Sequence, residues 1–179
     1  MIGLNVMFWM MVILFGVIGS MRGWAKELLV SFAVILALFI ATVLEKFVPP
    51  IREGLALDST ALFWMRALIL IALVAFGYQT PNLPKLAGNP RFARERLQDI
   101  LLGVFLGAVN GYLIFGSLWS FMVSADYPFE HVILSPIGTQ FEEATNRLLS
   151  ILPPSWLGTS PAIYFAVAIA FVFVLVVFI

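Results

Sequence analysis

Few side chains in this sequence could carry out chemistry, and they are not grouped. There is one histidine, His131, and no cysteine, so a metal or haem site lacks ligands. The motifs G-x-S-x-G and H-E-x-x-H and the phosphate-binding loop are absent. A serine nucleophile inside a membrane would need a histidine or lysine base at the same depth, and the apolar segments contain neither. The sequence therefore predicts no catalytic residue, no metal site and no cofactor. We expect a protein that is not an enzyme, with His131 in an exposed loop.

Three charges lie within the stretch RGWAKE, residues 22–27, between two long apolar segments. This pattern predicts the short connection of a helical hairpin. Gly23 can adopt backbone angles that other residues avoid. Arg22 and Lys26 would anchor the turn at the lipid headgroups, and Glu27 would lie at the positive end of the second helix dipole. We expect these charges to remain in water or among the headgroups.

Arg66 is the one charge inside an apolar segment. Charged residues at membrane depth are candidates for function. Two structural explanations are favoured: the side chain extends to the outer headgroups, or Glu45 at the outer end of the preceding segment neutralises it. The functional alternative is that Arg66 lines a substrate pathway.

These residues are set in an unusually apolar chain, with 62% hydrophobic and 11% charged residues against about 25% charged in an ordinary soluble domain. Five segments are long and apolar enough to cross a bilayer, and they lie at residues 2–21, 28–44, 60–78, 100–123 and 162–179. Solid apolar segments predict helices rather than barrel strands. We expect one all-α membrane domain, residues 1–179, built as a polytopic bundle of four to five transmembrane helices in the lipid bilayer.

Two further features concern surfaces. Residues 139–152 have one apolar and one polar side at helical spacing, which predicts an amphipathic helix between spans four and five that lies on the membrane surface or covers the ends of the spans.

The formal net charge is zero and the basic residues are scattered, so no nucleic-acid partner is expected.

Small residues recur at helical spacing in the fourth span. Gly103, Gly107 and Gly111 form a stripe along one side of the helix, and Asn110 is assigned to the same stripe. The first span has a shorter series that includes Gly16 and Gly19. Such stripes favour close packing of the first and fourth spans, with hydrogen bonds from Asn110, or contact with a second copy or another membrane protein. The simple alternative is that glycine is common in membrane helices.

The basic residues predict an orientation. Six lie in the loops after the first and third spans: Arg22, Lys26, Lys85, Arg91, Arg94 and Arg96. Three lie in the other loops: Lys46, Arg52 and Arg147. Because positive loops stay in the cytoplasm, we expect the amino terminus and residues 124–161 outside.

Two segments resemble a known family. In the first segment, an Arg-Gly turn is followed by a basic-Glu-Leu step into an apolar helix: GSMRGWAKELLVSFAVILALFIA. In the second segment, an acidic residue precedes a helix with a Gly-x-x-x-Gly pattern: LQDILLGVFLGAVNGYLIFGSL. Both are similar to the signatures of the CvpA family, the colicin V production proteins of bacterial inner membranes. The resemblance covers residues 1 to about 123 and differs at Asn5 and Asn110, where the family usually has aspartate and arginine. The motif positions are Arg22, Gly23, Glu27, Asp99, Gly103, Gly107 and Gly111.

The resemblance implies a small multi-pass protein of the bacterial inner membrane. It would support colicin V (toxin) production or export and envelope homeostasis, without enzymatic activity, through a partner or self-association. The alternative is a small transporter or channel subunit with a pathway past Arg66 and Asn110. A further hypothesis is that Arg22 reaches Asp99 and couples the two signature segments into one cytoplasmic-side site.

Overall fold

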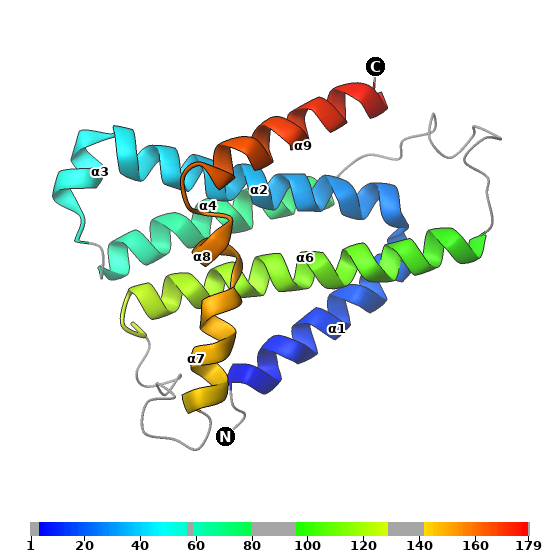
Figure 1. The fold of residues 1–179 in the computed structure, drawn as a ribbon, viewed down its shortest axis with the longest axis horizontal. Coiled ribbons are helices and arrows are strands. Elements are labelled where there is room, and N and C mark those ends of the chain that lie inside the picture. The colour runs from blue at the N-terminus through cyan, green and yellow to red at the C-terminus, as the bar shows by residue number, and fades with distance from the viewer. Residues whose placement is uncertain (1–3, 57–58, 80–95, 129–141, 179) are drawn as a thin grey trace.

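The structure is a computed structural model, and it describes residues 4–56, 59–79, 96–128 and 142–178. Four helices in this part of the chain are long and apolar enough to cross a membrane: α1 (Leu4–Arg22), α2 (Trp24–Phe47), α4 (Thr60–Tyr78) and α6 (Arg96–Ser124). They run back and forth along one direction (Figure 1). The expected all-α polytopic bundle is therefore confirmed, and the protein is a multi-pass membrane protein.

Four shorter helices complete the described part: α3 (Pro49–Gly54), α7 (Glu142–Ile151), α8 (Pro153–Trp156) and α9 (Ala162–Phe178). α7 confirms the predicted amphipathic helix, whose first residues, 139–141, lie outside the described residues. It lies across the bundle near the start of α1 (Figure 1), where the Thr145 hydroxyl donates a 3.3 Å hydrogen bond to Asn5 Oδ1. The 17-residue α9 matches the fifth apolar segment and packs against α2 through ring contacts such as Phe39 with Tyr164.

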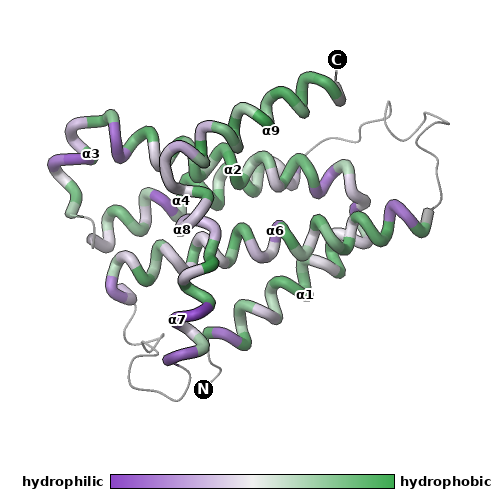
Figure 2. Tube along the Cα trace, in the orientation of Figure 1, coloured by the Kyte–Doolittle hydropathy of each residue, from purple (hydrophilic) through white to green (hydrophobic). Residues whose placement is uncertain are grey.

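The long helices consist largely of hydrophobic residues, shown in green in Figure 2, and many of their large apolar side chains are exposed. Ile13 is 66% exposed, Phe105 64% and Ile169 69%. A surface of this kind is unfavourable in water and suits contact with lipid. The buried core is also apolar and centres on α2, which packs against α4, α6 and α9.

The connection between α1 and α2 is shorter than the sequence suggested. The expected six-residue turn is wrong: α1 continues to Arg22 and α2 begins at Trp24, so Gly23 alone separates them. Its φ of 85° and ψ of 156° are accessible to glycine and strongly disfavoured for other residues. The first turn of α2 contains Trp24, Ala25 and Lys26, which are compatible with a helix. Packing against the neighbouring helices stabilises this turn.

Local sequence also explains the other helix ends. α2 ends at Phe47, just before Pro49 and Pro50 start α3, since proline lacks the N–H that would continue the helix. α4 begins after Ser59, whose hydroxyl accepts the Leu62 N–H at 3.2 Å. α6 has 29 residues and is about 43 Å long, which exceeds the roughly 30 Å hydrocarbon core.

Candidate functional site

The glycine stripe of α6 packs against α1 within one chain, and this is the most extensive helix contact of the described residues. A Cβ atom at Gly107 would lie 2.9 Å from Gly19 Cα, and one at Gly111 would lie 2.9 Å from Val12 Cα. Gly103 similarly faces the backbone of Gly19. The two backbones are thus in direct contact, which only glycine permits, and the predicted packing of spans one and four is confirmed.

Asp99 joins the start of α6 to the start of α2. Its Oδ1 accepts the Trp24 N–H at 3.2 Å, and both carboxylate oxygens lie about 3 Å from where a Cβ of Gly23 would be. The carboxylate therefore supplies the side-chain cap that Gly23 cannot supply, and its charge faces the positive end of the α2 dipole. The expectation that Asp99 couples the two segments through Arg22 is wrong: the acceptor of the Arg22 ion pair is Glu27.

Glu27 is fully buried, with 0% of its surface exposed. The expectation that its charge remains in water or among headgroups is therefore wrong. Its Oε1 accepts Arg22 Nη1 at 2.7 Å, and its Oε2 accepts Asn110 Nδ2 at 2.8 Å and the Tyr78 hydroxyl at 3.4 Å. Because α2 begins at Trp24, its first turn lies inside the bundle, and Glu27 points toward α4 and α6. A buried carboxylate is tolerated when it is paired and hydrogen-bonded in this way.

Asn110 completes the hydrogen bonding around this carboxylate. Its Nδ2 also donates to the Glu27 carbonyl at 2.8 Å, and its Oδ1 accepts the Ser31 hydroxyl at 2.7 Å. Asn110 is fully buried and bonds to α2, so the expectation that it supports the contact between the first and fourth spans is wrong. Three residues turn an α-helix through about 300°, which places Asn110 at the edge of the stripe of Gly107 rather than along it.

Arg22 links three helix ends. Besides the ion pair with Glu27, its Nη2 donates to the Tyr78 carbonyl at 3.2 Å, and its guanidinium carbon lies 4.2 Å from the centroid of the Tyr78 ring. The carbonyls in the last turn of a helix lack partners within the helix, and the arginine supplies one at the end of α4. The planar fork of the guanidinium lets it bind the carboxylate and this carbonyl together.

We call these five residues, Arg22, Glu27, Ser31, Tyr78 and Asn110, the polar cluster. Its hydrogen bonds fix the rotation of α1, α2, α4 and α6 relative to one another at one end of the bundle. The Ser31 hydroxyl donates to an amide oxygen and not to a base, so it is not activated as a nucleophile. The arrangement can thus position the helices relative to one another.

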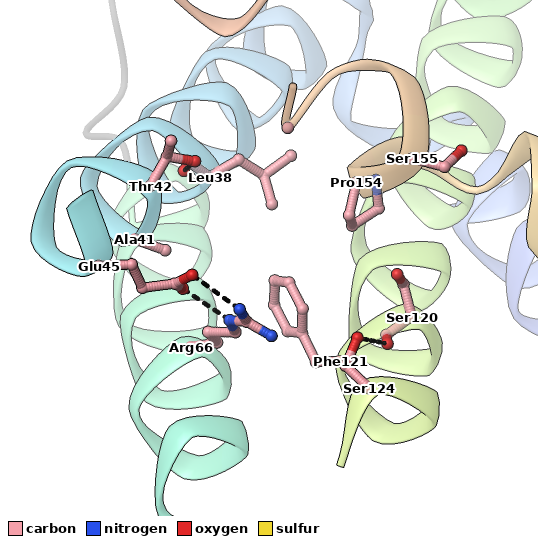
Figure 3. Close-up of a pocket in the computed structure, with 11 residues that line it drawn as sticks. Leu38, Ala41, Thr42, Glu45, Arg66, Ser120, Phe121, Ser124, Pro154 and Ser155 are labelled. Carbon is pink, nitrogen blue, oxygen red and sulfur yellow. Dashed lines mark hydrogen bonds and ion pairs between the residues drawn. The ribbon is translucent and has the colours of Figure 1, made fainter. Parts of the chain in front are cut away.

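Arg66 lies at the opposite end of the bundle. Its Nε and Nη2 donate to the two carboxylate oxygens of Glu45 at 2.6 and 2.7 Å, which agrees with the proposed neutralisation of Arg66 by Glu45. The pair borders a cavity of about 260 Å³ between α2 and α4 on one side and α6 and α8 on the other (Figure 3).

The structure thus brings all the motif residues of α1, α2 and the first half of α6 to one end of the bundle, while Arg66 is separate. Ser31 and Tyr78 are members of the polar cluster that sequence reasoning missed. Ser31 could have been found from its spacing: it follows Glu27 by four residues and therefore lies on the same side of the helix. His131, Lys85, Arg91 and Arg94 lie outside the described residues.

Comparison of the chain with known protein families, with curated proteins and with solved structures finds no match.

Proposed function

We propose that this chain is a non-enzymatic component of the bacterial inner membrane, of the CvpA type, that supports colicin V or other toxin production or export and envelope homeostasis. It acts as a membrane scaffold that presents the α1–α2 turn to a partner protein. The amino terminus is outside and the turn is cytoplasmic in this proposal, as the distribution of basic residues favours.

One observation supports this proposal above the others. The two segments that carry the resemblance are far apart in sequence. They nevertheless form a single unit in which Asp99 caps α2, Asn110 bonds Glu27, and the glycines allow α1 to approach α6. Residues of a scaffold site are expected to hold each other in this way, because a contact surface for a partner needs a rigid support.

A partner contact on the glycine stripe itself would compete with α1, which covers it. We therefore place the contact with a partner, or with a second copy, beside the turn. The first turns of α6 extend past the α1–α2 turn (Figure 1), and Leu97 and Leu101 there are 67% and 60% exposed. Residues four apart lie on one side of a helix, so these leucines form an apolar ridge next to Asp99.

The alternative of a small transporter or channel subunit receives less support. A pathway needs polar residues that converge near the membrane centre. Glu27 of the polar cluster and Glu45 of the Arg66 pair are separated along α2 by about 27 Å, from the helical rise of about 1.5 Å per residue. The buried residues of α2 between them include Val34, Ala37 and Leu38, an apolar layer that disfavours passage of a polar substrate.

The proposal is tested by complementation of a bacterial strain that lacks the gene, with envelope integrity and toxin export as readouts at matched protein levels. Arg22→Lys keeps the charge but loses the fork that binds Glu27 and the Tyr78 carbonyl. Asp99→Asn keeps an acceptor for the Trp24 N–H and removes the charge beside the proposed contact. We expect both variants to insert normally and to rescue poorly.

Gly54→Ala is the matched control, since a Cβ there meets nothing within 4 Å, and it should rescue fully. Full rescue by both Arg22→Lys and Asp99→Asn would show that the turn is only an anchor, and the proposed scaffold site would be abandoned.

A further inference from the structure

The cavity beside Arg66 is largely polar and lies apart from the polar cluster. Its apolar walls are formed by Leu38, Ala41, Phe121, Pro154 and Gly158. Its polar lining comes from four helices: Thr42, Glu45, Arg66, Ser120, Ser124 and Ser155. Charged side chains that are only partly exposed between membrane helices, as Arg66 and Glu45 are, are unfavourable unless they have polar partners. A polar occupant of the cavity can supply such partners.

The position of the cavity limits what that occupant can be. Glu45 lies two residues before the end of α2, and Ser124 is the last residue of α6, so the cavity is at the level of the helix ends. Helix ends of a membrane bundle lie near the lipid headgroups. The bilayer itself therefore brings phosphate and ammonium groups to this depth.

The charges of the cavity are complementary to a zwitterion. Arg66 uses its Nε and Nη2 for Glu45, and its third guanidinium nitrogen points from the pair toward Phe121 and the cavity (Figure 3). A guanidinium has more N–H donors than this ion pair uses, and a carboxylate has more lone pairs than it uses. The pair can therefore bind a negative and a positive group at once. Side-chain exposures of 15% for Arg66 and 25% for Glu45 keep both groups within reach of a ligand.

We propose that this cavity binds the phosphoethanolamine headgroup of a phospholipid. The phosphate accepts hydrogen bonds from Arg66 and the Ser120 hydroxyl, and the primary ammonium donates to Glu45. A volume of about 260 Å³ is below the roughly 300–1,000 Å³ of pockets that enclose whole drug-sized ligands. It accommodates a phosphate with a two-carbon ammonium arm, while the acyl chains remain in the bilayer.

Other headgroups fit this charge arrangement less well. A purely anionic headgroup such as phosphatidylglycerol brings no positive group to Glu45 and is repelled by its carboxylate. Phosphatidylcholine has the phosphate, but its trimethylated nitrogen has no N–H to donate and is larger. The cavity is therefore expected to select the primary ammonium, and one missing charge-assisted hydrogen bond predicts a preference of about tenfold or more.

The test uses the purified full chain in detergent, with phosphatidylethanolamine, phosphatidylcholine and phosphatidylglycerol of identical acyl chains titrated one at a time and bound lipid counted by native mass spectrometry. We expect phosphatidylethanolamine to bind at least about tenfold more tightly than the other two. Two variants should remove this preference without leaving a lone charge: the double variant Glu45→Gln/Arg66→Gln, and Ser120→Leu, which fills the cavity and keeps the ion pair.

The control is the double variant Arg52→Gln/Glu53→Gln. It removes an ion pair of 2.6 Å whose side chains are 59% and 66% exposed, at the same end of the bundle and away from the cavity, and it should retain the preference. Equal binding of the three lipids would overturn the proposal, and so would an unchanged preference in both cavity variants.

A second arm identifies the source of the headgroup. Glycerophosphoethanolamine, which has no acyl chains, is added as a competitor at millimolar concentration. Weak competition supports a membrane lipid as the ligand, whereas complete displacement supports the same headgroup chemistry in a soluble molecule. The cavity is far from the polar cluster, so this proposal and the proposed scaffold function can fail independently.

Discussion

Substitution of Gly107 by alanine tests the close contact of α1 and α6 most directly. The added Cβ would lie 2.9 Å from Gly19 Cα, whereas ordinary contacts of this kind are 3.4–4 Å, and it would be closer still to the Phe15 carbonyl oxygen. The two helices must therefore separate by at least about 0.5 Å at their crossing, by comparison with ordinary van der Waals distances.

The cost of this separation can be estimated from dispersion energy. A gap of 0.5–1 Å forfeits about a quarter to a half of each contact of about 0.1–0.2 kcal/mol. If the crossing has roughly as many atom pairs as one buried leucine, about 40–60, the central values give a loss of about 2.8 kcal/mol. This agrees with the roughly 1–3 kcal/mol measured for overpacked cores and corresponds to about a 100-fold change in the unfolding equilibrium.

The assay is equilibrium unfolding in mixed micelles with increasing sodium dodecyl sulfate, followed by tryptophan fluorescence. Two controls grade the effect. A Cβ at Gly16 would lie 3.4 Å from the Val104 carbonyl oxygen, an ordinary contact, so Gly16→Ala should stay within about 1 kcal/mol of the wild type. A Cβ at Gly54 meets nothing within 4 Å, so Gly54→Ala should not lower stability.

The order of the three variants decides the outcome. Stability should fall most in Gly107→Ala, little in Gly16→Ala and not at all in Gly54→Ala. If Gly107→Ala were as stable as the wild type, the backbones would not be in direct contact and the reasoning on the glycine stripe would be refuted.

Three further predictions concern the cap, the polar cluster and the orientation. Asn110→Ala should cost about 1–3 kcal/mol in the same unfolding assay, because it removes one hydrogen bond to the buried Glu27 carboxylate and one to the Glu27 carbonyl. Ser20→Ala, which removes a bond within an exposed turn of α1, should cost less than about 0.5 kcal/mol. Equal losses would contradict the importance of the cluster. Asp99→Leu removes the cap of α2 and should cost about 0.5–2 kcal/mol, whereas Asp99→Asn should cost clearly less, and a reversed order would argue against capping. In intact cells, a membrane-impermeant thiol reagent should label a cysteine at position 131 (His131→Cys) and not one at position 25 (Ala25→Cys), and the opposite pattern would reverse the proposed orientation.

The sequence by itself determined the elements that depend on local patterns. Apolar segments and proline positions predicted the four long helices, with residues 60–78 matching α4 at both ends. Spacing of four residues predicted the stripe of Gly103, Gly107 and Gly111, and the short connection predicted the special backbone of Gly23. These features could be predicted because helix periodicity, hydropathy and backbone sterics act within a few residues of the chain.

The tertiary structure decided which side chains meet. Nothing local distinguishes a Glu27 that faces the headgroups from one that is buried, and the choice followed from the rotation of α2 against α4 and α6. The same packing makes Glu27, and not Asp99, the ion-pair partner of Arg22. It also directs the hydrogen bonds of Asn110 to α2 rather than to α1. The cavity beside Arg66 likewise needs residues from α2, α4, α6 and α8. Partners of buried polar groups are set by how whole helices pack, since an unpaired group inside the bundle is costly and every helix must satisfy several of them together.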